Sequence, residues 1–412
     1  MFIDVRKAHL NAVCDEEEWV ELPEEFWKFG RYAKLKRWLY GMRKAAAGWE
    51  EDYAKRMEGV GFRRGKGAPA VFYNSKTDVR VVVHGDDFTF SGTREELEKM
   101  RSKMGEWYDI KDRGIMGGAQ AEIEEVTILG RTVRWTAEGI KHEADAGHMK
   151  KLMDAEGLEE TSKSVVGPVM KENIGRQGAE EETLEEKWEH KEFRSKGARL
   201  NYLGQDRSDI QYAVKEICQG MSKPTVEGRT KIKRAVRYLV GAKRLVWKCT
   251  EKEDDAKDVL VDVFVDSDWA SGWQRKSTSG GMMTVDGVGV KHWSRTQKAR
   301  ALSVGEAEYY AMVTGCAEGL GLQALADDLG WKVMVRIWTD SSAAKAVASR
   351  RGLGKLRHVE LKWLWVQDMV KEGRVKLRTV RGDENVADHL TKPKTRAEVE
   401  WLLEKVGAEF RE

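Results

Sequence analysis

The stretch "VRVVVHGDDFTFSG", from Val79 to Gly92, places two adjacent carboxylates in the middle of a hydrophobic pattern. A run of β-branched residues leads into Asp86 and Asp87, and apolar residues resume directly after them. Two such arms around a short Gly-Asp segment predict a β-hairpin whose turn holds both acids at the edge of a hydrophobic core. Two like charges at such an edge repel each other and need a physical reason to be there.

The composition is typical of a globular protein with more than one domain. The 412 residues are enough for roughly two or three domains. Charged residues make up 34% of the chain, but 16 Trp and 10 Phe supply enough bulk for hydrophobic cores. The net charge of +3 indicates no global basic field, so nucleic-acid binding would require the 72 Lys and Arg to cluster on one face.

Several classes of protein are disfavoured by the sequence. The cysteines are far apart and form no CxxC pair, which argues against a disulfide framework or a zinc site and favours a reducing intracellular compartment. No apolar run is long enough to span a bilayer, and the N-terminus lacks the pattern of a signal peptide. Its first residues have the pattern of a strand, so we expect the chain to begin inside a domain. We expect no membrane partner, since the sequence shows neither a membrane span nor a signal peptide.

The first half of the chain mixes short strands and helices. Apolar spacing predicts a helix over residues 35–57 and another over 95–107, with Thr93 as the N-cap of the latter. Residues 120–165 predict further strands and a short helix, and residues 191–245 predict helices. The charged, glycine-containing segment 171–187 is the expected linker.

A compact α/β domain is predicted for residues 257–395, after the hydrophilic segment 251–258. The sequence "VLVDVFVDSDW" alternates apolar and polar residues, which predicts a half-buried strand, and Asp286-Gly287 predicts a hairpin turn. The elements expected after it are a helix over 306–329, a strand over 333–339, helices over 341–349 and 358–371, a strand over 375–380 and a last helix.

Four acids recur at the ends of the elements expected in this domain: Asp266, Glu308, Asp340 and Asp388. If these ends converge, the mutual repulsion of the acids is severe unless cations neutralise it. Mg²⁺ prefers such oxygen ligands, and two ions about 4 Å apart can activate a water and stabilise the leaving oxygen of a phosphodiester. Taken singly, each acid is better explained as a helix cap or a solvated surface acid, as for Asp340 before Ser341-Ser342; only the joint pattern favours a metal site.

Four blocks in this half resemble the RNase H domain of copia-type retrotransposon polyproteins, in the same order: "VDSDWASGWQRKSTSG", "ALSVGEAEYYAM", "IWTDSSAA" and "ENVADHLTKP". The resemblance implies that Asp266, Glu308, Asp340 and Asp388 are the catalytic, metal-binding acids. Asp268 and Glu306 are near neighbours; we choose Asp266 because it ends the alternating strand, and Glu308 because it matches the ligand of the family's "EAEY". The implied reaction is hydrolysis of the RNA strand of an RNA–DNA hybrid.

The opening hairpin, "HGDDFTFSG", resembles the paired aspartates of reverse transcriptases. This resemblance implies that Asp86 and Asp87 hold the Mg²⁺ ions that activate a primer 3′-hydroxyl and bind nucleotide phosphates. Asp4, in "FIDVRKAHLNA", matches the third carboxylate of that site. The blocks "LKRWLYGMRKAAAGW", "RLNYLGQDRSDIQYAV" and "KRAVRYLVG" resemble later parts of the family, so the resemblance covers nearly the whole chain.

The implied architecture is an α+β reverse-transcriptase palm without fingers at residues 1–118, a helical thumb or connection region at 119–255, and an α/β RNase H-like domain with a mixed sheet at 256–412. The implied activities are RNA-directed DNA polymerase, a nucleotidyltransferase, and ribonuclease H, an endonuclease. The implied cofactor is Mg²⁺, two per active site, with Mn²⁺ as a substitute. The implied partners are an RNA–DNA hybrid, a DNA primer on an RNA template, and dNTPs, in a cytoplasmic particle or the nucleus.

The sequence departs from the family at several positions. His84 replaces an aromatic residue two positions before the Asp pair, and His9 replaces the Phe or Tyr that discriminates against ribonucleotides. Ala46 and Ser208 stand at usual prolines, and Gly305 at a usual Thr or Ser. Without fingers the palm should polymerise poorly. Three hypotheses remain: an active nuclease with an incomplete polymerase, a part of a longer working enzyme, and a catalytically decayed or co-opted nucleic-acid-binding relic.

Basic residues in two segments are candidates for contacts with nucleic-acid phosphates. The run "SRTQKAR" contributes Arg295, Lys298 and Arg300, although a solvated loop explains it almost as well. A helical run contributes Lys233 and Arg237, for which a role in solubility alone is an equally good explanation. For His358 we expect a structural or substrate-lining role rather than that of a catalytic base. Trp293 is a stacking candidate beside Lys291 and His292, although a buried strand tryptophan is the commoner outcome.

Overall fold

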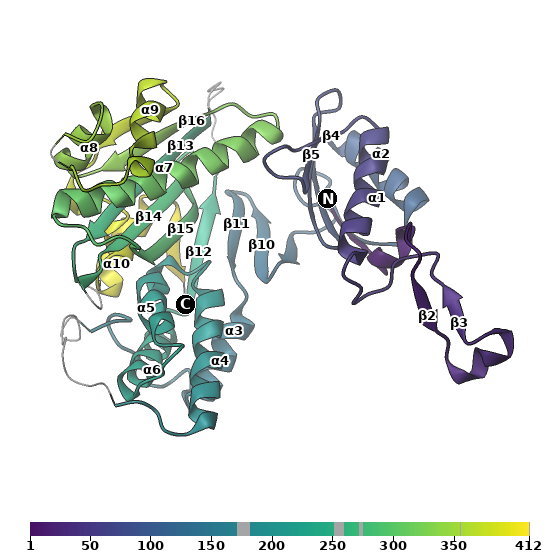
Figure 1. Ribbon diagram of the computed structural model, residues 1–412, viewed down its shortest axis with the longest axis horizontal. Coiled ribbons are helices and arrows are strands. Elements are labelled where there is room, and N and C mark those ends of the chain that lie inside the picture. The colour runs from purple at the N-terminus through teal and green to yellow at the C-terminus, as the bar shows by residue number, and fades with distance from the viewer. Residues whose placement is uncertain (171–181, 251–258, 272–274, 355, 412) are drawn as a thin grey trace. The chain divides into compact units, whose positions relative to one another are not determined.

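The computed structural model describes residues 1–170, 182–250, 259–271, 275–354 and 356–411 (Figure 1). Its contacts divide the chain into two compact units. The first unit is Met1–Glu124 with Ala324–Lys332, and the second is Glu125–Gln323 with Val333–Glu412. The predicted hydrophilic break at 251–258 and most of the predicted linker at 171–187 lie outside the described residues. Among the described helices, none is both long enough and apolar enough to cross a membrane.

The first unit is built on a six-stranded sheet in the order β4-β5-β6-β7-β1-β8. Helices α1 (Ala45–Gly59) and α2 (Arg94–Trp107) contribute to one hydrophobic core with this sheet. Strands β2 (Trp19–Glu21) and β3 (Tyr32–Lys34) form a separate two-stranded sheet. The strands of the large sheet are β1 (Phe2–Val5), β4 (Arg63–Arg64), β5 (Val71–Asn74), β6 (Val79–His84), β7 (Asp87–Ser91) and β8 (Ile110–Gly114).

The hairpin predicted around the Asp pair is confirmed. Strands β6 and β7 pair antiparallel with His84 opposite Asp87, so Gly85 and Asp86 form a two-residue turn. Gly85 has φ 64°, the left-handed conformation that glycine adopts at the first central position of a type II′ turn. On its other side β7 pairs with β1. The N-cap Thr93 and the helix after it are also confirmed.

The helix predicted over residues 35–57 begins later than expected. Its apolar face is present in α1, where Trp49, Tyr53 and Met57 are buried in the core. The preceding residues are not helical, because the chain turns at Gly41, which has φ 88°. The periodicity therefore located the buried face of the helix correctly but placed its start, residue 35 instead of Ala45, ten residues too early.

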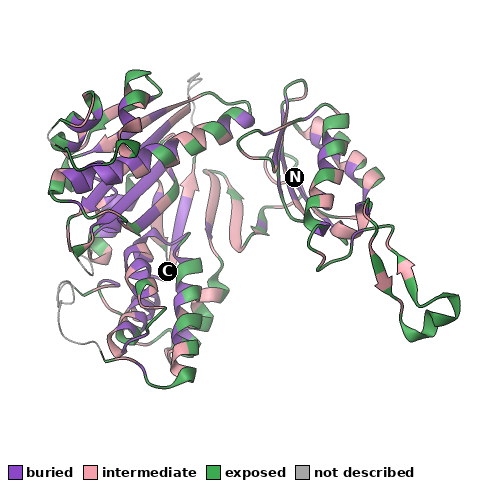
Figure 2. Ribbon diagram, viewed as in Figure 1, coloured by how far each residue is buried: buried purple, intermediate pink, exposed green. Residues whose placement is uncertain are grey.

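The second unit contains two five-stranded sheets, one of which is mixed and is the sheet expected for the α/β domain. Its order is β15-β14-β13-β16-β17: β13 pairs antiparallel with β14 and parallel with β16, and β16 pairs parallel with β17. Figure 2 shows that most residues of β13 and β14 are buried. They are β13 (Val259–Asp268), β14 (Thr278–Val285), β15 (Val288–Thr296), β16 (Val333–Thr339) and β17 (Val375–Thr379).

The long helix α7 (Val304–Asp328) packs on this mixed sheet through small residues. A Cβ added to Gly315 would lie 2.4 Å from Val265 Cγ1, and one added to Gly319 would lie 2.7 Å from Val335 Cγ1. The absence of side chains at these two positions, one helical turn apart, lets the helix axis approach β13 and β16 closely. Shorter helices complete the domain: α8 (Ser342–Ser349), α9 (Trp365–Lys371) and α10 (Arg396–Glu404).

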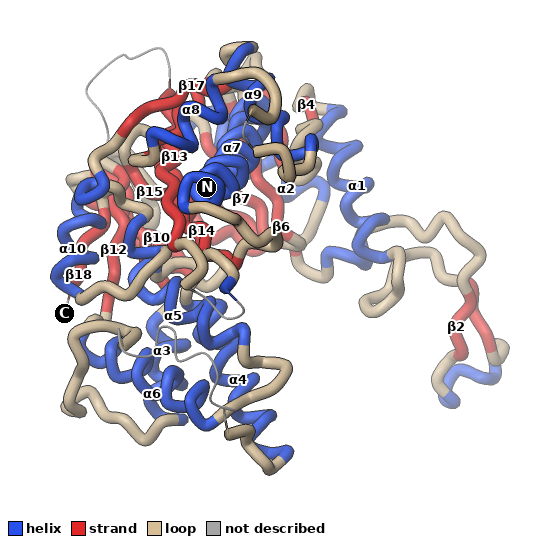
Figure 3. Tube along the Cα trace, turned by 60° about the vertical axis from the view of Figure 1, so that its left-hand side comes forward, coloured by secondary structure: helices blue, strands red, loops and turns tan. Residues whose placement is uncertain are grey.

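The other sheet of the second unit has the order β18-β12-β11-β10-β9. Its strands are β9 (Glu125–Ile128), β10 (Arg131–Thr136), β11 (Gly139–Ala144), β12 (Arg244–Cys249) and β18 (Ala408–Arg411). It therefore joins strands from both sides of the boundary expected at residues 255/256. Figure 3 shows helices α3 (Ala146–Ala155), α4 (Lys187–Leu203), α5 (Ser208–Gln219) and α6 (Val226–Gly241) gathered as a bundle, which has its own hydrophobic core. The three-domain division stays a prediction.

Candidate active sites

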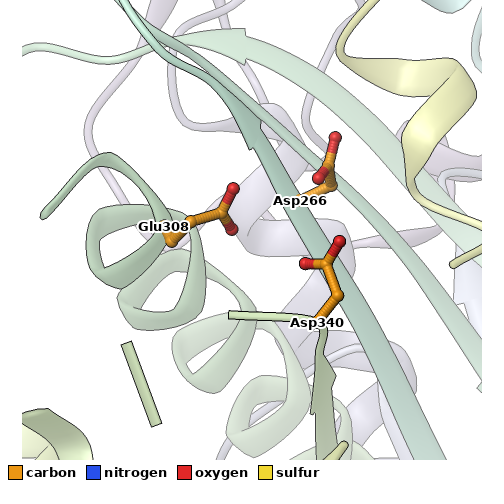
Figure 4. Close-up of side chains that lie close together, drawn as sticks. All are labelled: Asp266, Glu308 and Asp340. Carbon is orange, nitrogen blue, oxygen red and sulfur yellow. The ribbon is translucent and has the colours of Figure 1, made fainter. Parts of the chain in front are cut away.

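Three of the four acids predicted in the second half come together at one edge of the mixed sheet. Asp266 lies near the end of β13, Asp340 directly follows β16, and Glu308 lies on α7. The parallel register of β13 and β16 ends at Phe264 opposite Trp338, so two further residues bring Asp266 beside Asp340. Candidate ligand atoms of the three residues all lie within 4.8 Å of one another. Figure 4 shows the three carboxylates around a common space.

The group of three consists of two buried acids and one exposed acid. Asp266 is 3% exposed and Glu308 is 6% exposed, whereas Asp340 is open to solvent. Burial raises the pKa of Asp266 to about 7, against the opposing effects of Lys392 and of the hydroxyl that Thr391 donates to Asp266. Burial and then the nearby Asp266 raise the pKa of Glu308 to about 8. The acids therefore resist ionising together unless a cation joins them.

The same acids fit a divalent cation. Glu308 Oε1 accepts a hydrogen bond of 3.2 Å from the Ser267 amide, but the buried Oε2 atom of Glu308 has no hydrogen-bond partner. An unpartnered buried carboxylate oxygen beside two other carboxylates is the kind of donor set that Mg²⁺ prefers. The capping role considered for Asp340 falls to Ser341, whose Oγ accepts from the Ala344 amide at 3.1 Å.

Asp388, the fourth predicted acid, does not belong to the close group of three. Its two carboxylate oxygens lie 2.5 Å from Lys392 Nζ and 2.7 Å from Lys394 Nζ. Partial burial lowers the pKa of Lys392, but Asp266 and Asp388 outweigh that effect and leave the pKa above its usual value. Lys392 is therefore a charged neighbour of both acids, and the assignment of Asp388 as a metal ligand stays a prediction.

Glu306 and Asp268, the two acids weighed against the chosen ligands, lie outside the group of three. The carboxylate of Glu306 accepts hydrogen bonds from the Leu302 amide at 3.0 Å and from the Tyr310 hydroxyl at 2.9 Å. His358 Nε2 lies 2.9 Å from Glu306 Oε2, so this contact holds the segment around His358 against the start of α7. Glu306 is thus occupied by contacts that hold the polypeptide together.

In the first unit, the structure brings Asp4 and Asp87 together. They are direct partners in the antiparallel pairing of β1 and β7, so their side chains share one face of the sheet. Asp86 occupies the exposed turn of the hairpin. Within the described ranges, Asp4, Asp86 and Asp87 do not form a close group of three like the one in the second unit.

Arg113 lies between the two paired aspartates and was not among the predicted site residues. Its Nη2 atom donates to Asp4 Oδ2 at 2.8 Å and to Asp87 Oδ1 at 2.9 Å. Arg113 belongs to β8, which pairs with β1, and the register between these strands shifts at Phe2 and Ile3 so that Arg113 has no residue opposite it. Burial raises the pKa of Asp87, Arg113 lowers it, and the other two aspartates raise it, with a net increase. The only signal in the sequence is a charged residue in a strand with no hydrophobic alternation.

Two of the residues that depart from the resembled family, His9 and His84, take up defined positions in the first unit. His9 stacks on Tyr40 with 4.3 Å between the ring centroids. His84 lies opposite Asp87 at the end of β6. Their effect on the selection of nucleotides stays a prediction.

Two of the five predicted nucleic-acid contacts are bonded to other parts of the protein. Arg295 pairs with Glu318 at 2.8 Å, and Arg237 Nε donates to the Lys163 carbonyl at 3.1 Å. The side chains of Lys233, Lys298 and Arg300 belong to exposed residues. Trp293, weighed as a stacking residue, is buried against Gly281 of β14, which agrees with the commoner outcome. The role of the five basic residues stays a prediction.

No family model matches the chain. The chain is 24% identical over 420 residues to the retrovirus-related Pol polyprotein from transposon TNT 1-94 of Nicotiana tabacum, which covers 98% of this chain and 30% of that protein. It is 23% identical over 419 residues to the retrovirus-related Pol polyprotein from transposon RE1 of Arabidopsis thaliana, covering 98% of this chain and 27% of that protein. The chain thus spans less than a third of the length of these curated relatives.

A solved structure has a similar fold over most of the chain. The foamy viral protease-reverse transcriptase, in complex with an RNA/DNA hybrid, superposes with a TM-score of 0.52 at 13% sequence identity. The superposition covers 92% of this chain and 44% of that one. At this level of identity the likeness concerns the fold alone.

Proposed function

We propose that this chain, a homologue of the copia-type retrotransposon Pol polyproteins, is a divalent-cation-dependent ribonuclease H that cleaves the RNA strand of RNA–DNA hybrids. The observation that carries the proposal is the close group of Asp266, Glu308 and Asp340 at one edge of the mixed sheet. A carboxylate group of this kind binds Mg²⁺ or Mn²⁺ and places it against a phosphodiester.

The residues of the group have separate tasks in this mechanism. Asp266 and Glu308, both buried, supply fixed oxygen ligands, while the exposed Asp340 supplies a ligand on the side open to substrate. The Thr391 hydroxyl and the Ser267 amide each hold one of the buried carboxylates in orientation. A bound divalent cation would lower the pKa of a coordinated water and stabilise the negative charge that develops on the phosphate.

A second ion in the same site would need Asp388. Because its carboxylate is paired with Lys392 and Lys394, a second cation would have to compete with two ammonium groups. In the absence of a second ion, Lys392 offers its positive charge beside Asp266, where it can attract a phosphate oxygen of the substrate. The two-ion mechanism therefore depends on displacement of these lysines.

The first unit corresponds, in this proposal, to a reverse-transcriptase palm acting on a DNA primer, an RNA template and dNTPs. Its acids are Asp4, Asp86 and Asp87, of which two are neutralised in part by Arg113. The nuclease is the better-supported activity because its acids are grouped without such an ion pair. The alternative is a catalytically decayed or co-opted relic that binds nucleic acid through residues such as Lys298 and Arg300.

The test is cleavage of a labelled RNA–DNA hybrid by the full chain with Mg²⁺, with Mn²⁺ and with a chelator. We expect cleavage only with a divalent cation, and loss of cleavage in Asp340→Asn. Asp383→Asn, at an exposed acid paired with Arg381, is the matched control and should cleave normally. A correctly folded chain that fails to cleave would favour the relic, and equal cleavage by Asp340→Asn and the unchanged chain would refute the site.

A further inference from the structure

The palm carboxylates of the first unit already have a cationic partner from the chain itself. One nitrogen of Arg113 bonds to both Asp4 and Asp87, at 2.8 and 2.9 Å. The side chains of Arg113, Asp4 and Asp87 are 29%, 26% and 29% exposed, so all three are largely shielded from solvent. Hydrogen bonds between ionised groups in such surroundings are among the strong ones in proteins.

We propose that Arg113 is a built-in counter-ion that keeps a divalent cation out of the palm carboxylates, so that this chain binds catalytic metal in its nuclease centre and not in its palm. Arg113 has this role only if the chain is, as proposed above, a Pol-derived enzyme whose acids are candidates for divalent cations. As they stand in the structure, Asp4 and Asp87 do not fit a metal ion, because the guanidinium is bonded to one oxygen of each carboxylate and places a positive charge between them.

The physical basis is competition between two positive charges for the same oxygens. An arginine does not deprotonate in a protein, so its charge cannot be removed by a change in pH. A divalent cation that approached Asp4 and Asp87 would meet the repulsion of this charge, or would have to displace two charge-assisted hydrogen bonds. The irregular register of β8, which leaves Arg113 without an opposite residue, is the kind of local feature that redirects a side chain toward a site.

The nuclease centre lacks this arrangement. Its nearby lysines, Lys392 and Lys394, form their ion pairs with Asp388. Lys392 acts on Asp266 through its charge, but no cationic side chain among the described residues bridges the group of three by ion pairs. The two centres therefore differ in how their negative charge is balanced: by a side chain of the protein in the palm, and by an ion from solution in the nuclease.

The experiment is a titration of the full-length protein with Mn²⁺, in which free Mn²⁺ is followed by electron paramagnetic resonance. The starting protein carries Asp340→Asn, which weakens the nuclease centre. Adding Arg113→Gln, which removes the charge but keeps a hydrogen-bond donor, should make Mn²⁺ binding in the palm roughly tenfold tighter or more. Adding Asp87→Asn to that protein should abolish the gain. Arg56→Leu is the matched control: Arg56 pairs with one acid, Asp52, at 2.9 Å, and its loss should create no binding.

Two results would overturn the role of Arg113. In the first, the protein with its native Arg113 binds Mn²⁺ in the palm, and Asp87→Asn then lowers the number of ions bound. This measurement needs no change at Arg113, so it is informative even if the Arg113 variants fail to fold. In the second, the folded Arg113→Gln protein gains no binding. Failure of the proposed nuclease has a different signature: Asp340→Asn leaves Mn²⁺ binding unchanged, whatever happens at Asp87.

Discussion

Two glutamates on α7, Glu306 and Glu308, have opposite surroundings although only Ala307 separates them. Glu306 accepts hydrogen bonds from the chain around it and pairs with His358, whereas Glu308 faces Asp266 and Asp340 with one oxygen unpartnered. Residues two apart on a helix point in widely different directions, so one of them can serve the fold while the other serves the site.

We therefore expect the two glutamate-to-glutamine changes to separate stability from metal binding. Glu308→Gln should abolish Mg²⁺-dependent cleavage and the rise in melting temperature on adding Mg²⁺. It should cost little stability in chelator, because glutamine resembles the neutral acid that a pKa of about 8 favours when no cation is bound. Glu306→Gln should lower the free energy of unfolding by about 1–3 kcal/mol, since it disturbs a buried hydrogen-bond network, and should keep the Mg²⁺ response. Thermal melts of both variants, with and without Mg²⁺, provide the comparison, and identical responses would contradict these roles.

His292 makes the second unit sensitive to acid. Burial, and then the nearby His389, lower its pKa to about 3 from an ordinary value of 6.5. Because the folded state favours the neutral ring, its stabilising contribution is complete above pH 6.5 and is lost as the pH falls toward 3. Between pH 6.5 and pH 3, His292 should lower the free energy of unfolding by about 1.4 kcal/mol per pH unit. The buried His389 acts in the same direction, whereas the raised pKa values of Asp266 and Glu308 act in the opposite direction.

His292→Phe removes the proton-binding group and keeps an aromatic ring beside Trp247, whose centroid lies 6.2 Å from that of His292. Lowering the pH from 7.5 to 5 should therefore lower the urea midpoint less, or raise it more, in this variant than in the unchanged chain. An equal loss of stability in both proteins would assign the acid sensitivity to other groups.

Individual acids could be predicted from the sequence when two kinds of information agreed. Asp266 and Asp340 stand at the ends of apolar strands, and the resemblance implies Glu308. The sequence therefore predicts all three acids, which the structure brings together. Arg113 was missed because its partners lie on β1 and β7, far away in the sequence. Neither hydrophobic periodicity nor a local motif reports which strands become neighbours.

The contact of α7 with the mixed sheet determines where Glu308 lies. Gly315 faces Val265 on β13, the strand that carries Asp266, and Gly319 faces Val335 on β16, the strand that leads to Asp340. The close approach of helix and sheet is therefore the structural condition for grouping the acids. Larger residues at these glycines would push α7, and with it Glu308, away from the strand ends.

We expect Gly315→Ala and Gly319→Ala to destabilise the second unit by about 1–3 kcal/mol and to weaken Mg²⁺ binding, because the added Cβ atoms overlap valine side chains. Gly321→Ala is the matched control on the same helix: nothing lies within 4 Å of its added Cβ. It should stabilise the helix by about 0.5–1 kcal/mol. Urea unfolding and Mg²⁺ titration of the three variants test this, and a destabilised Gly321→Ala would argue against the packing explanation.

Elements with a strong local pattern were predictable, and those defined by distant partners were not. The strand at 333–339 was placed correctly because its apolar residues alternate, and α7 to within two residues because its apolar run is long. The pairing of β18 with β12 had no sequence signal, because short strands acquire their identity from their neighbours. The helix starting at Ala45 shows the same limit, since the turn at Gly41 overrides the periodicity before it.

In the protein as a whole, the two units contain carboxylate centres of different kinds. The centre of the first unit is balanced by Arg113, whereas in the second unit burial raises the pKa values of Asp266 and Glu308. A divalent cation should therefore stabilise the second unit selectively. A ligand that binds only the folded state adds about 2.7 kcal/mol at a concentration one hundred times its Kd.

Hydrogen–deuterium exchange of the full chain can test this difference in each unit separately. On adding saturating Mg²⁺, we expect slower exchange in β13 and the start of α7, and unchanged exchange in β1 and β7. Asp340→Asn should remove the slowing in the second unit, and Arg113→Gln should extend it to β1 and β7, because it frees the oxygens of Asp4 and Asp87. Slower exchange in β1 and β7 of the unchanged chain would mean that the first unit binds the ion in spite of Arg113. In that case the charge of a single side chain does not decide which centre holds metal.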